Sequence, residues 1–141
     1  MRWLACAPGP NFSVQDCHVG YVEAGDRRAL YEGARLLVQP SFDEGFGLPV
    51  LEAMTVGVPV VAADRGSLPE VLGGAGILAN PDKPGDIARA IAQVLNDDRI
   101  AAACTDAGIA RARQFRWNDT ADRVHDMFRN AIERRARATL G

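Results

Sequence analysis

The sequence predicts an α/β protein built on a doubly wound parallel sheet, and three observations favour this fold class. Short apolar runs at residues 36–39 and 58–62 are typical of buried strands. Residues 84–96 carry apolar side chains at helical spacing. Expected strands and helices alternate at short intervals, which favours a parallel sheet with helices on both faces. We expect about four strands and an amphipathic helix at the C-terminal end.

The first third of the chain is expected to hold one strand and one helix. Residues 1–13 contain several Pro and Gly residues and are expected to be irregular. A short strand is expected at 18–22. A short helix at 27–32 then follows, with Asp26 as its N-cap and Gly33 at its end.

The middle of the chain predicts two buried strands that flank a helix. Pro40 ends the strand at 36–39, and a loop at 41–47 follows. Pro49 suits the first turn of a helix that runs to residue 55 or 56. Residues 58–62 form the next strand.

Helices dominate the second half of the sequence. The run Ser67-Leu68-Pro69-Glu70 matches a capping box and predicts a short helix that ends near Gly73. A minimal strand is expected at 76–78, and a helix at 98–112 follows the one at 84–96. The last helix is expected after Trp117 and Asn118, and it has one apolar face, formed by Ala121, Val124, Phe128, Ala131 and Ile132.

Sixteen basic and eighteen acidic residues give a net charge of −2, so we expect no nucleic-acid partner. The charge is unevenly distributed. Residues 111–141 hold eight Arg and four acidic residues, whereas residues 1–110 hold eight basic and fourteen acidic residues. We interpret the basic segment as a solvated helix face, and peripheral contact with anionic lipid is the alternative.

Cysteine usage and hydropathy indicate a cytoplasmic protein. Cys6, Cys17 and Cys104 are odd in number and widely spaced, which fits neither a disulfide framework nor a zinc site. We therefore expect no bound metal. No run approaches the ~18 apolar residues of a membrane span, and the apolar run at the start is too short for a signal peptide.

The loop at 41–47 and the helix start after it carry the most chemical information. Gly45 and Gly47 let a backbone approach a ligand closely. The amides of Phe46, Gly47 and Leu48 lie where the helix dipole favours an anion such as a phosphate.

Two carboxylates flank those amides. Glu44 precedes the helix and Glu52 lies about one turn inside it, so the two should be on the order of 10 Å apart. That separation is too large for a proton-sharing pair. Carboxylates accept hydrogen bonds, so we expect hydroxyl-rich groups as their partners, a ribose for one and a hexose for the other.

Glu44 and Glu52 belong to the run Glu-Gly-Phe-Gly-Leu-Pro-x-Leu-Glu-Ala-Met, which resembles the signature of group 1 (family 4) retaining glycosyltransferases with the GT-B fold. The resemblance covers roughly residues 18–130. Further segments that resemble the family pattern are Val19-Gly20-Tyr21-Val22, Leu30-Tyr31-x-x-Ala34, Val38-x-Pro40-Ser41, Gly57-x-Pro59-Val60-Val61-Ala62, Leu68-Pro69-Glu70-Val71, Asn80-Pro81 and Phe115-Arg116-Trp117.

The resemblance implies a Rossmann-like donor domain whose parallel sheet is incomplete at its N-terminus. Its ligand would be a UDP-, GDP- or ADP-linked sugar. By this resemblance Glu44 is the catalytic residue that faces the donor sugar, and Glu52 holds the ribose hydroxyls. The substrate-binding backbone near sugar and diphosphate is then that of Gly45, Phe46, Gly47 and Leu48. Transfer would retain the anomeric configuration without a metal or other cofactor.

Residues 1–17 do not match the family. The expected organisation is therefore an unmatched segment at 1–17, a partial nucleotide-sugar-binding domain at 18–113 and a C-terminal helix at 114–141. Family members also have an acceptor-binding N-terminal domain, and an Arg and a Lys that clamp the diphosphate. This sequence has none of these at matching positions.

Three functional hypotheses remain open at this point. The first is a truncated glycosyltransferase with little activity alone. The second is a non-catalytic nucleotide-sugar-binding module that a missing N-terminal half on another chain completes. The third is a glycosidase with Glu44 and Glu52 as its acid pair, which is weaker because a carboxylate inside a helix would have to face the same water as the loop acid.

Overall fold

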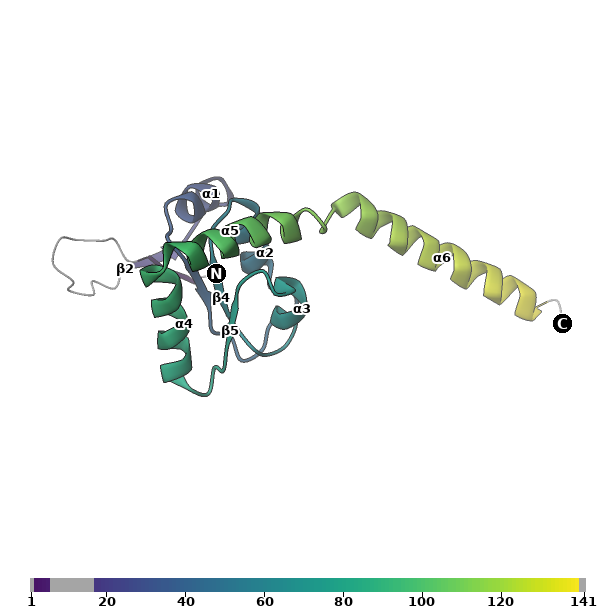
Figure 1. The fold of residues 1–141 in the computed structure, drawn as a ribbon. Helices are drawn as coiled ribbons and strands as arrows, with labels where there is room; N and C mark the ends of the chain where they lie inside the picture. Colours follow the sequence, from purple (N-terminus) through teal and green to yellow (C-terminus); the bar gives the residue numbers. More distant parts are fainter. Residues whose placement is uncertain (1, 6–16, 140–141) are drawn as a thin grey trace.

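The computed structural model describes residues 2–5 and 17–139 and confirms the α/β fold (Figure 1). Within these residues, β3 (Leu37–Gln39), β4 (Val60–Ala63) and β5 (Ile77–Ala79) form a three-stranded parallel sheet in the order β3-β4-β5. Val61 of β4 lies opposite both Val38 and Ile77. The carboxyl ends of the strands therefore meet at one edge of the sheet.

Helices connect and extend the strands. The helices at 84–96 and 98–112 have the expected bounds, and the others begin or end within a few residues of expectation. The described helices are α1 (Ala24–Glu32), α2 (Leu48–Thr55), α3 (Leu68–Leu72), α4 (Pro84–Asn96), α5 (Asp98–Ala112) and α6 (Trp117–Thr139).

Both faces of the sheet are covered. Val60 and Ala62 of β4 belong to a buried cluster with side chains of α1, α2, α3 and the end of α5. Val61, between them, belongs to a second cluster with Ala90 and Val94 of α4. Because successive side chains of a strand point to opposite faces, β4 serves both clusters and is buried throughout.

The N-terminal residues differ from expectation. Residues 2–5, expected to be irregular, form β1 (Arg2–Ala5), and residues 6–13 lie outside the described part of the chain. The strand expected at 18–22 is β2 (Cys17–Tyr21), which pairs antiparallel with β1. The parallel sheet therefore has three described strands rather than about four. The partner of a strand is a non-local choice that the apolar pattern of the strand does not specify.

Two predicted helix caps are wrong. α1 begins after Glu23, so Asp26 lies in its first turn, where its charge still suits the helix dipole. Ser67 precedes α3 but has helical backbone angles, φ −82° and ψ −12°, and its side chain caps nothing. A capping side chain needs an extended backbone to reach back to the helix amides. The Ser67 hydroxyl donates instead to the carbonyl of Glu44, at 2.9 Å.

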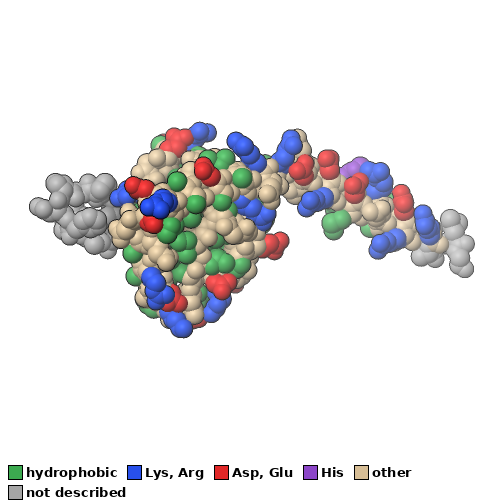
Figure 2. All heavy atoms as spheres, viewed as in Figure 1, with side chains coloured by type: hydrophobic (Ala, Val, Ile, Leu, Met, Phe, Trp, Pro, Cys, Tyr) green, Lys and Arg blue, Asp and Glu red, His purple; other side chains and the backbone are tan. Residues whose placement is uncertain are grey.

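The last helix, α6, extends away from the body of the protein (Figure 1). Its apolar face has the expected membership and is exposed: Phe128 is 66% and Ile132 69% exposed. Basic and acidic side chains are interspersed along the side of α6 that Figure 2 shows. No helix in the described residues is both long enough and apolar enough to span a membrane.

The burial pattern predicts where stability resides. Met54→Ala should lower the free energy of unfolding by about 2–5 kcal/mol, because Met54 is fully buried between α2 and α5. Phe128→Ala should change it by less than about 0.5 kcal/mol, because that ring is exposed. Urea unfolding followed by circular dichroism measures both. Equal losses would contradict a solvent-exposed α6.

Candidate functional site

The loop between β3 and α2 lies at the carboxyl edge of the parallel sheet, where open α/β sheets bind ligands. Gly47 precedes α2 with φ 90°, a left-handed conformation that favours glycine. A Cβ on Gly47 would lie 2.9 Å from Cδ2 of Leu68, which is fully buried. A Cβ on Gly45 would meet no atom within 4 Å. Gly47 therefore sets the turn, and space lies open above Gly45.

The amides at the start of α2 are available to a ligand. Val50 and Leu51 donate to the carbonyl of Gly47, at 3.0 and 3.3 Å. In contrast, no backbone oxygen in the described residues accepts from the amides of Phe46, Gly47 or Leu48. The side chains of Phe46 and Leu48 are about half exposed. These amides and the positive end of the α2 dipole suit an anion.

Glu44 is held from two directions. Its Oε2 accepts from Nε2 of Gln39, the last residue of β3, at 3.0 Å, and the same nitrogen donates to Oγ of Ser41 at 2.8 Å. Its carbonyl accepts from the hydroxyl of Ser67, and a Cβ on Gly66 would lie 3.1 Å from that carbonyl. The carboxylate is thus oriented by one amide donor and keeps lone pairs for a ligand.

Glu52 is held by α1. Its Oε1 accepts from Nη1 of Arg27 at 3.3 Å, and its Oε2 accepts from the hydroxyl of Tyr31 at 2.9 Å. Burial raises the pKa of Tyr31 well above its ordinary value, and the hydrogen bond and charge of Glu52 raise it further, so the phenol remains a donor. Each carboxylate oxygen of Glu52 accepts one hydrogen bond within the protein and keeps a lone pair for a ligand.

The sequence reasoning missed four of these partners. It did not consider Arg27, Tyr31 and Gln39 as partners of the two carboxylates, and it assigned Ser67 to a helix cap. Arg27 and Tyr31 are four residues apart in the sequence, and helical residues at that spacing share a face. That spacing could have indicated that Arg27 and Tyr31 act together. It could not identify Glu52 as their partner, because Glu52 is 25 residues from Arg27 and 21 residues from Tyr31.

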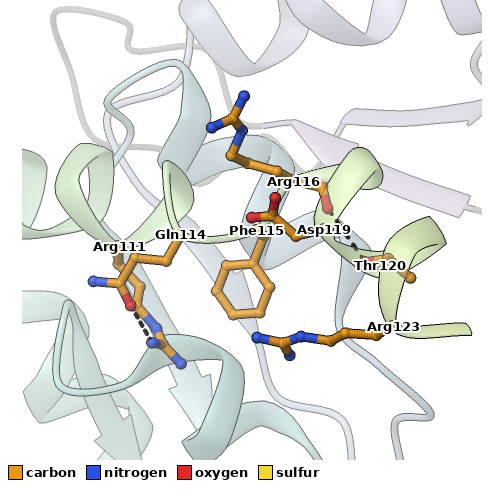
Figure 3. Close-up of a pocket in the computed structure, with 7 residues that line it drawn as sticks. All are labelled: Arg111, Gln114, Phe115, Arg116, Asp119, Thr120 and Arg123. Atoms are coloured by element: carbon orange, nitrogen blue, oxygen red, sulfur yellow. Dashed lines mark hydrogen bonds between the residues drawn. The ribbon is translucent and has the colours of Figure 1, made fainter. Parts of the chain in front are cut away.

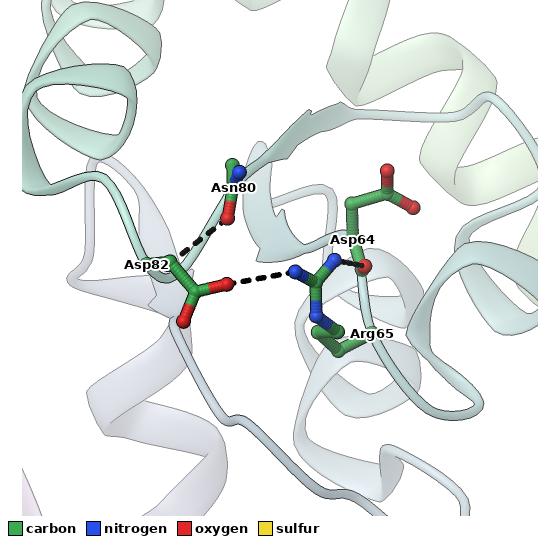
Figure 4. Close-up of polar contacts among 4 residues, drawn as sticks. All are labelled: Asp64, Arg65, Asn80 and Asp82. Carbon is green, nitrogen blue, oxygen red and sulfur yellow. Dashed lines mark hydrogen bonds and ion pairs between the residues drawn. The ribbon is translucent and has the colours of Figure 1, made fainter.

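A second polar group lies beyond the ends of β4 and β5 (Figure 4). Arg65 donates to the carbonyl of Asp64 and to Oδ2 of Asp82, both at 2.8 Å, and the Asp82 amide donates to Oδ1 of Asn80 at 3.0 Å. Asp64 and Arg65 follow β4 directly. The Arg65–Asp82 ion pair is exposed, so it contributes at most about 1 kcal/mol to the free energy of unfolding.

No group of three or more His, Cys, Asp or Glu side chains in the described residues could hold a metal ion. At this edge of the sheet, the free amides at the start of α2 are available as hydrogen-bond donors and the two oriented carboxylates as acceptors.

Comparison with known proteins identifies relatives of this chain. The family model described as glycosyl transferases group 1 matches residues 13–111. O-antigen chain mannosyltransferase B of Escherichia coli is 49% identical over 102 residues, which cover 72% of this chain and 27% of that protein. A D-inositol 3-phosphate glycosyltransferase of Corynebacterium glutamicum is 36% identical over 74% of this chain and 25% of that protein. The chain thus spans about a quarter of the length of these two curated relatives.

Solved structures with the same fold are also known. Sucrose-phosphate synthase from Thermosynechococcus elongatus superposes with a TM-score of 0.71 at 30% identity, covering 82% of this chain and 30% of that one. HepE of Anabaena in complex with UDP superposes with a TM-score of 0.66 at 28% identity, covering 72% of this chain and 29% of that one. Both are similar to this chain over most of its length.

The two glycines of the loop form a matched pair for mutagenesis. Gly47→Ala should lower the free energy of unfolding by about 1–3 kcal/mol, because alanine is strained at φ 90° and its methyl group would collide with Leu68. Gly45→Ala should change it by less than about 0.5 kcal/mol. Thermal unfolding of both variants measures the difference. Comparable losses would argue against the left-handed turn at Gly47.

Proposed function

The chain belongs to the group 1 glycosyl transferases, and we propose that it is the donor-binding part of a retaining glycosyltransferase that takes a nucleoside-diphosphate sugar. The observation that supports this most is the loop at 44–48. There, free amides at the start of α2 lie between two oriented carboxylates. The proposal includes the expected boundaries, with the donor domain at 18–113 and the terminal helix at 114–141.

The proposal assigns each group a role. Glu52, oriented by Arg27 and Tyr31, accepts hydrogen bonds from the two ribose hydroxyls. Glu44 faces the donor sugar. The backbone of Gly45, Phe46, Gly47 and Leu48 receives the diphosphate and the adjoining sugar. UDP bound to the similar protein HepE supports a nucleotide ligand, and the mannosyltransferase among the relatives supports mannose as the transferred sugar.

The chemistry assigned to this site is stabilisation of a leaving group. When the bond from the anomeric carbon to the diphosphate breaks, negative charge grows on the phosphate oxygens. Fixed amide dipoles and the α2 dipole meet that charge without reorganising, which lowers the barrier. Glu44 would hold the sugar hydroxyls while the anomeric carbon becomes electron-poor. In this proposal no step uses a metal or cofactor.

We further propose that α6 carries the donor domain onto the acceptor-binding part of the enzyme, on the same or another chain. The supporting observation is its exposed apolar face, on which Val124, Phe128 and Ile132 are each at least 45% exposed. Five Arg and four acidic residues in α6 nearly cancel, which favours a protein partner over anionic lipid. Binding of this chain to phosphatidylglycerol vesicles would favour lipid instead.

Calorimetry with carboxamide variants separates the two carboxylate roles. UDP, GDP and ADP, free and as their mannose and glucose conjugates, are titrated into the wild-type chain. Glu52→Gln should weaken both the free nucleotide and the nucleotide sugar by about 10- to 100-fold, the value of a lost hydrogen bond to a charged group. Glu44→Gln should weaken only the nucleotide sugar, because its partner is the sugar.

The control is Glu133→Gln, which changes the same side chain on α6, far along the chain from the loop. It should bind every ligand as the wild type does. The opposite order for the two site variants would reverse their roles. A folded wild-type sample that binds none of the ligands would refute the proposal.

A further inference from the structure

The side chain of Phe46 leaves the ligand loop and contacts Phe115, which lies between α5 and α6. The two ring centroids are 6.1 Å apart and the ring planes meet at 87°, an edge-to-face arrangement. Aromatic pairs prefer this geometry, because the positive edge of one ring faces the negative face of the other. Phe46 is 45% exposed, so its ring is partly buried, and Phe115 is one of the residues that contact it.

Phe115 is in turn held by Arg111. The guanidinium carbon of Arg111 lies 4.8 Å from the centroid of the Phe115 ring, a cation–π contact. Its nitrogens donate to the carbonyls of Val71 and Glu70, at 3.0 and 2.6 Å, and to Oε1 of Gln114 at 2.7 Å. The guanidinium therefore lies at the carbonyl end of α3, where a cation is favourable.

Arg111 can come close to the end of α3 because the next residue is Gly73, which has φ 55° and no side chain. A Cβ at that position would lie 2.6 Å from Nε of Arg111. The contacts from Arg111 to Phe115 and from Phe115 to Phe46 thus connect the carbonyl end of α3 with the ligand loop.

The other end of α3 holds the backbone of the same loop. The hydroxyl and amide of Ser67 both donate to the carbonyl of Glu44, at 2.9 and 3.4 Å. Leu68 packs over Gly47. One short helix consequently holds the loop at three places, directly at Glu44 and Gly47 and indirectly at Phe46.

We propose that Phe115 is a positioning residue for nucleotide-sugar binding, which acts through Phe46 and depends on the proposed function. By holding the Phe46 ring, it fixes the backbone that carries the amides of Phe46 and Gly47 before the diphosphate arrives. When a loop is already ordered, less conformational entropy is lost on binding, and the affinity for the ligand is higher. A cavity of about 310 Å³ beside the Phe115 ring offers room into which a smaller or displaced side chain could shift (Figure 3).

Calorimetry on Phe115→Leu tests the proposal with the nucleotide sugar that the wild type binds. The variant keeps an apolar side chain but lacks the ring, and we expect three- to tenfold weaker binding, the range that corresponds to one aromatic pair. Phe115→Tyr keeps the ring and should bind as the wild type does. Tyr21→Leu removes an exposed aromatic side chain from β2 and should also leave affinity unchanged.

A double-mutant cycle separates positioning from general destabilisation. If Phe115 acts through Phe46, then Phe46→Leu and Phe115→Leu together should weaken binding no more than the stronger single variant. A merely structural role would let the two losses multiply. Equal affinity of Phe115→Leu and the wild type would overturn the inference and leave the proposed function intact.

Nuclear magnetic resonance of the ligand-free protein gives a second readout that needs no nucleotide. Phe115→Leu should shift the amide resonances of residues 45–48, and Tyr21→Leu should not. Unchanged resonances in the loop would overturn the inference. Absence of nucleotide binding by a folded wild type would instead refute the proposed function, and this inference with it.

Discussion

The central strand β4 has no side that faces solvent, because each of its four residues, Val60–Ala63, is at most 1% exposed. A strand buried on both faces needs helices on both, and parallel neighbours need crossover connections that return to the same end of the sheet. The carboxyl ends of β3, β4 and β5 are therefore brought to one edge. Residues 39–44, 64–67 and 80–82, far apart in sequence, meet there because β4 is covered on both sides.

α3 has a larger part in this arrangement than its five residues suggest. A helix this short has little stability of its own. Its leucines, Leu68 and Leu72, are fully buried, and Arg111 satisfies carbonyls at its end. Packing and capping from distant segments therefore make it rigid. A rigid α3 can hold the ligand loop, so the geometry of the candidate site depends on α5 as much as on the loop itself.

The local pattern was sufficient to predict the fold class and most elements. Apolar runs predicted β3 and β4, helical spacing of apolar residues predicted α4, and an Ala-rich segment predicted α5. The Glu44 to Glu52 segment could be recognised from residue types alone. Contacts between distant segments could not be predicted in this way. The Ser67 side chain could have capped its own helix, but it donates instead to the carbonyl of Glu44, which is distant in the sequence. The partners Arg27, Tyr31 and Phe115 were missed because each reaches across tens of residues.

The exposure of α6 has a thermodynamic consequence. Every α6 side chain whose burial is described is exposed, so the helix gains little from the cooperative folding of the body, and its melting is governed by local interactions such as the Asp126–Arg129 pair. Its amide hydrogens should then exchange with solvent through local fraying, whereas those of β4 exchange only when the whole body opens. We therefore expect the described body and α6, joined at residues 113–116, to unfold separately, the body in a single cooperative transition and α6 gradually with temperature.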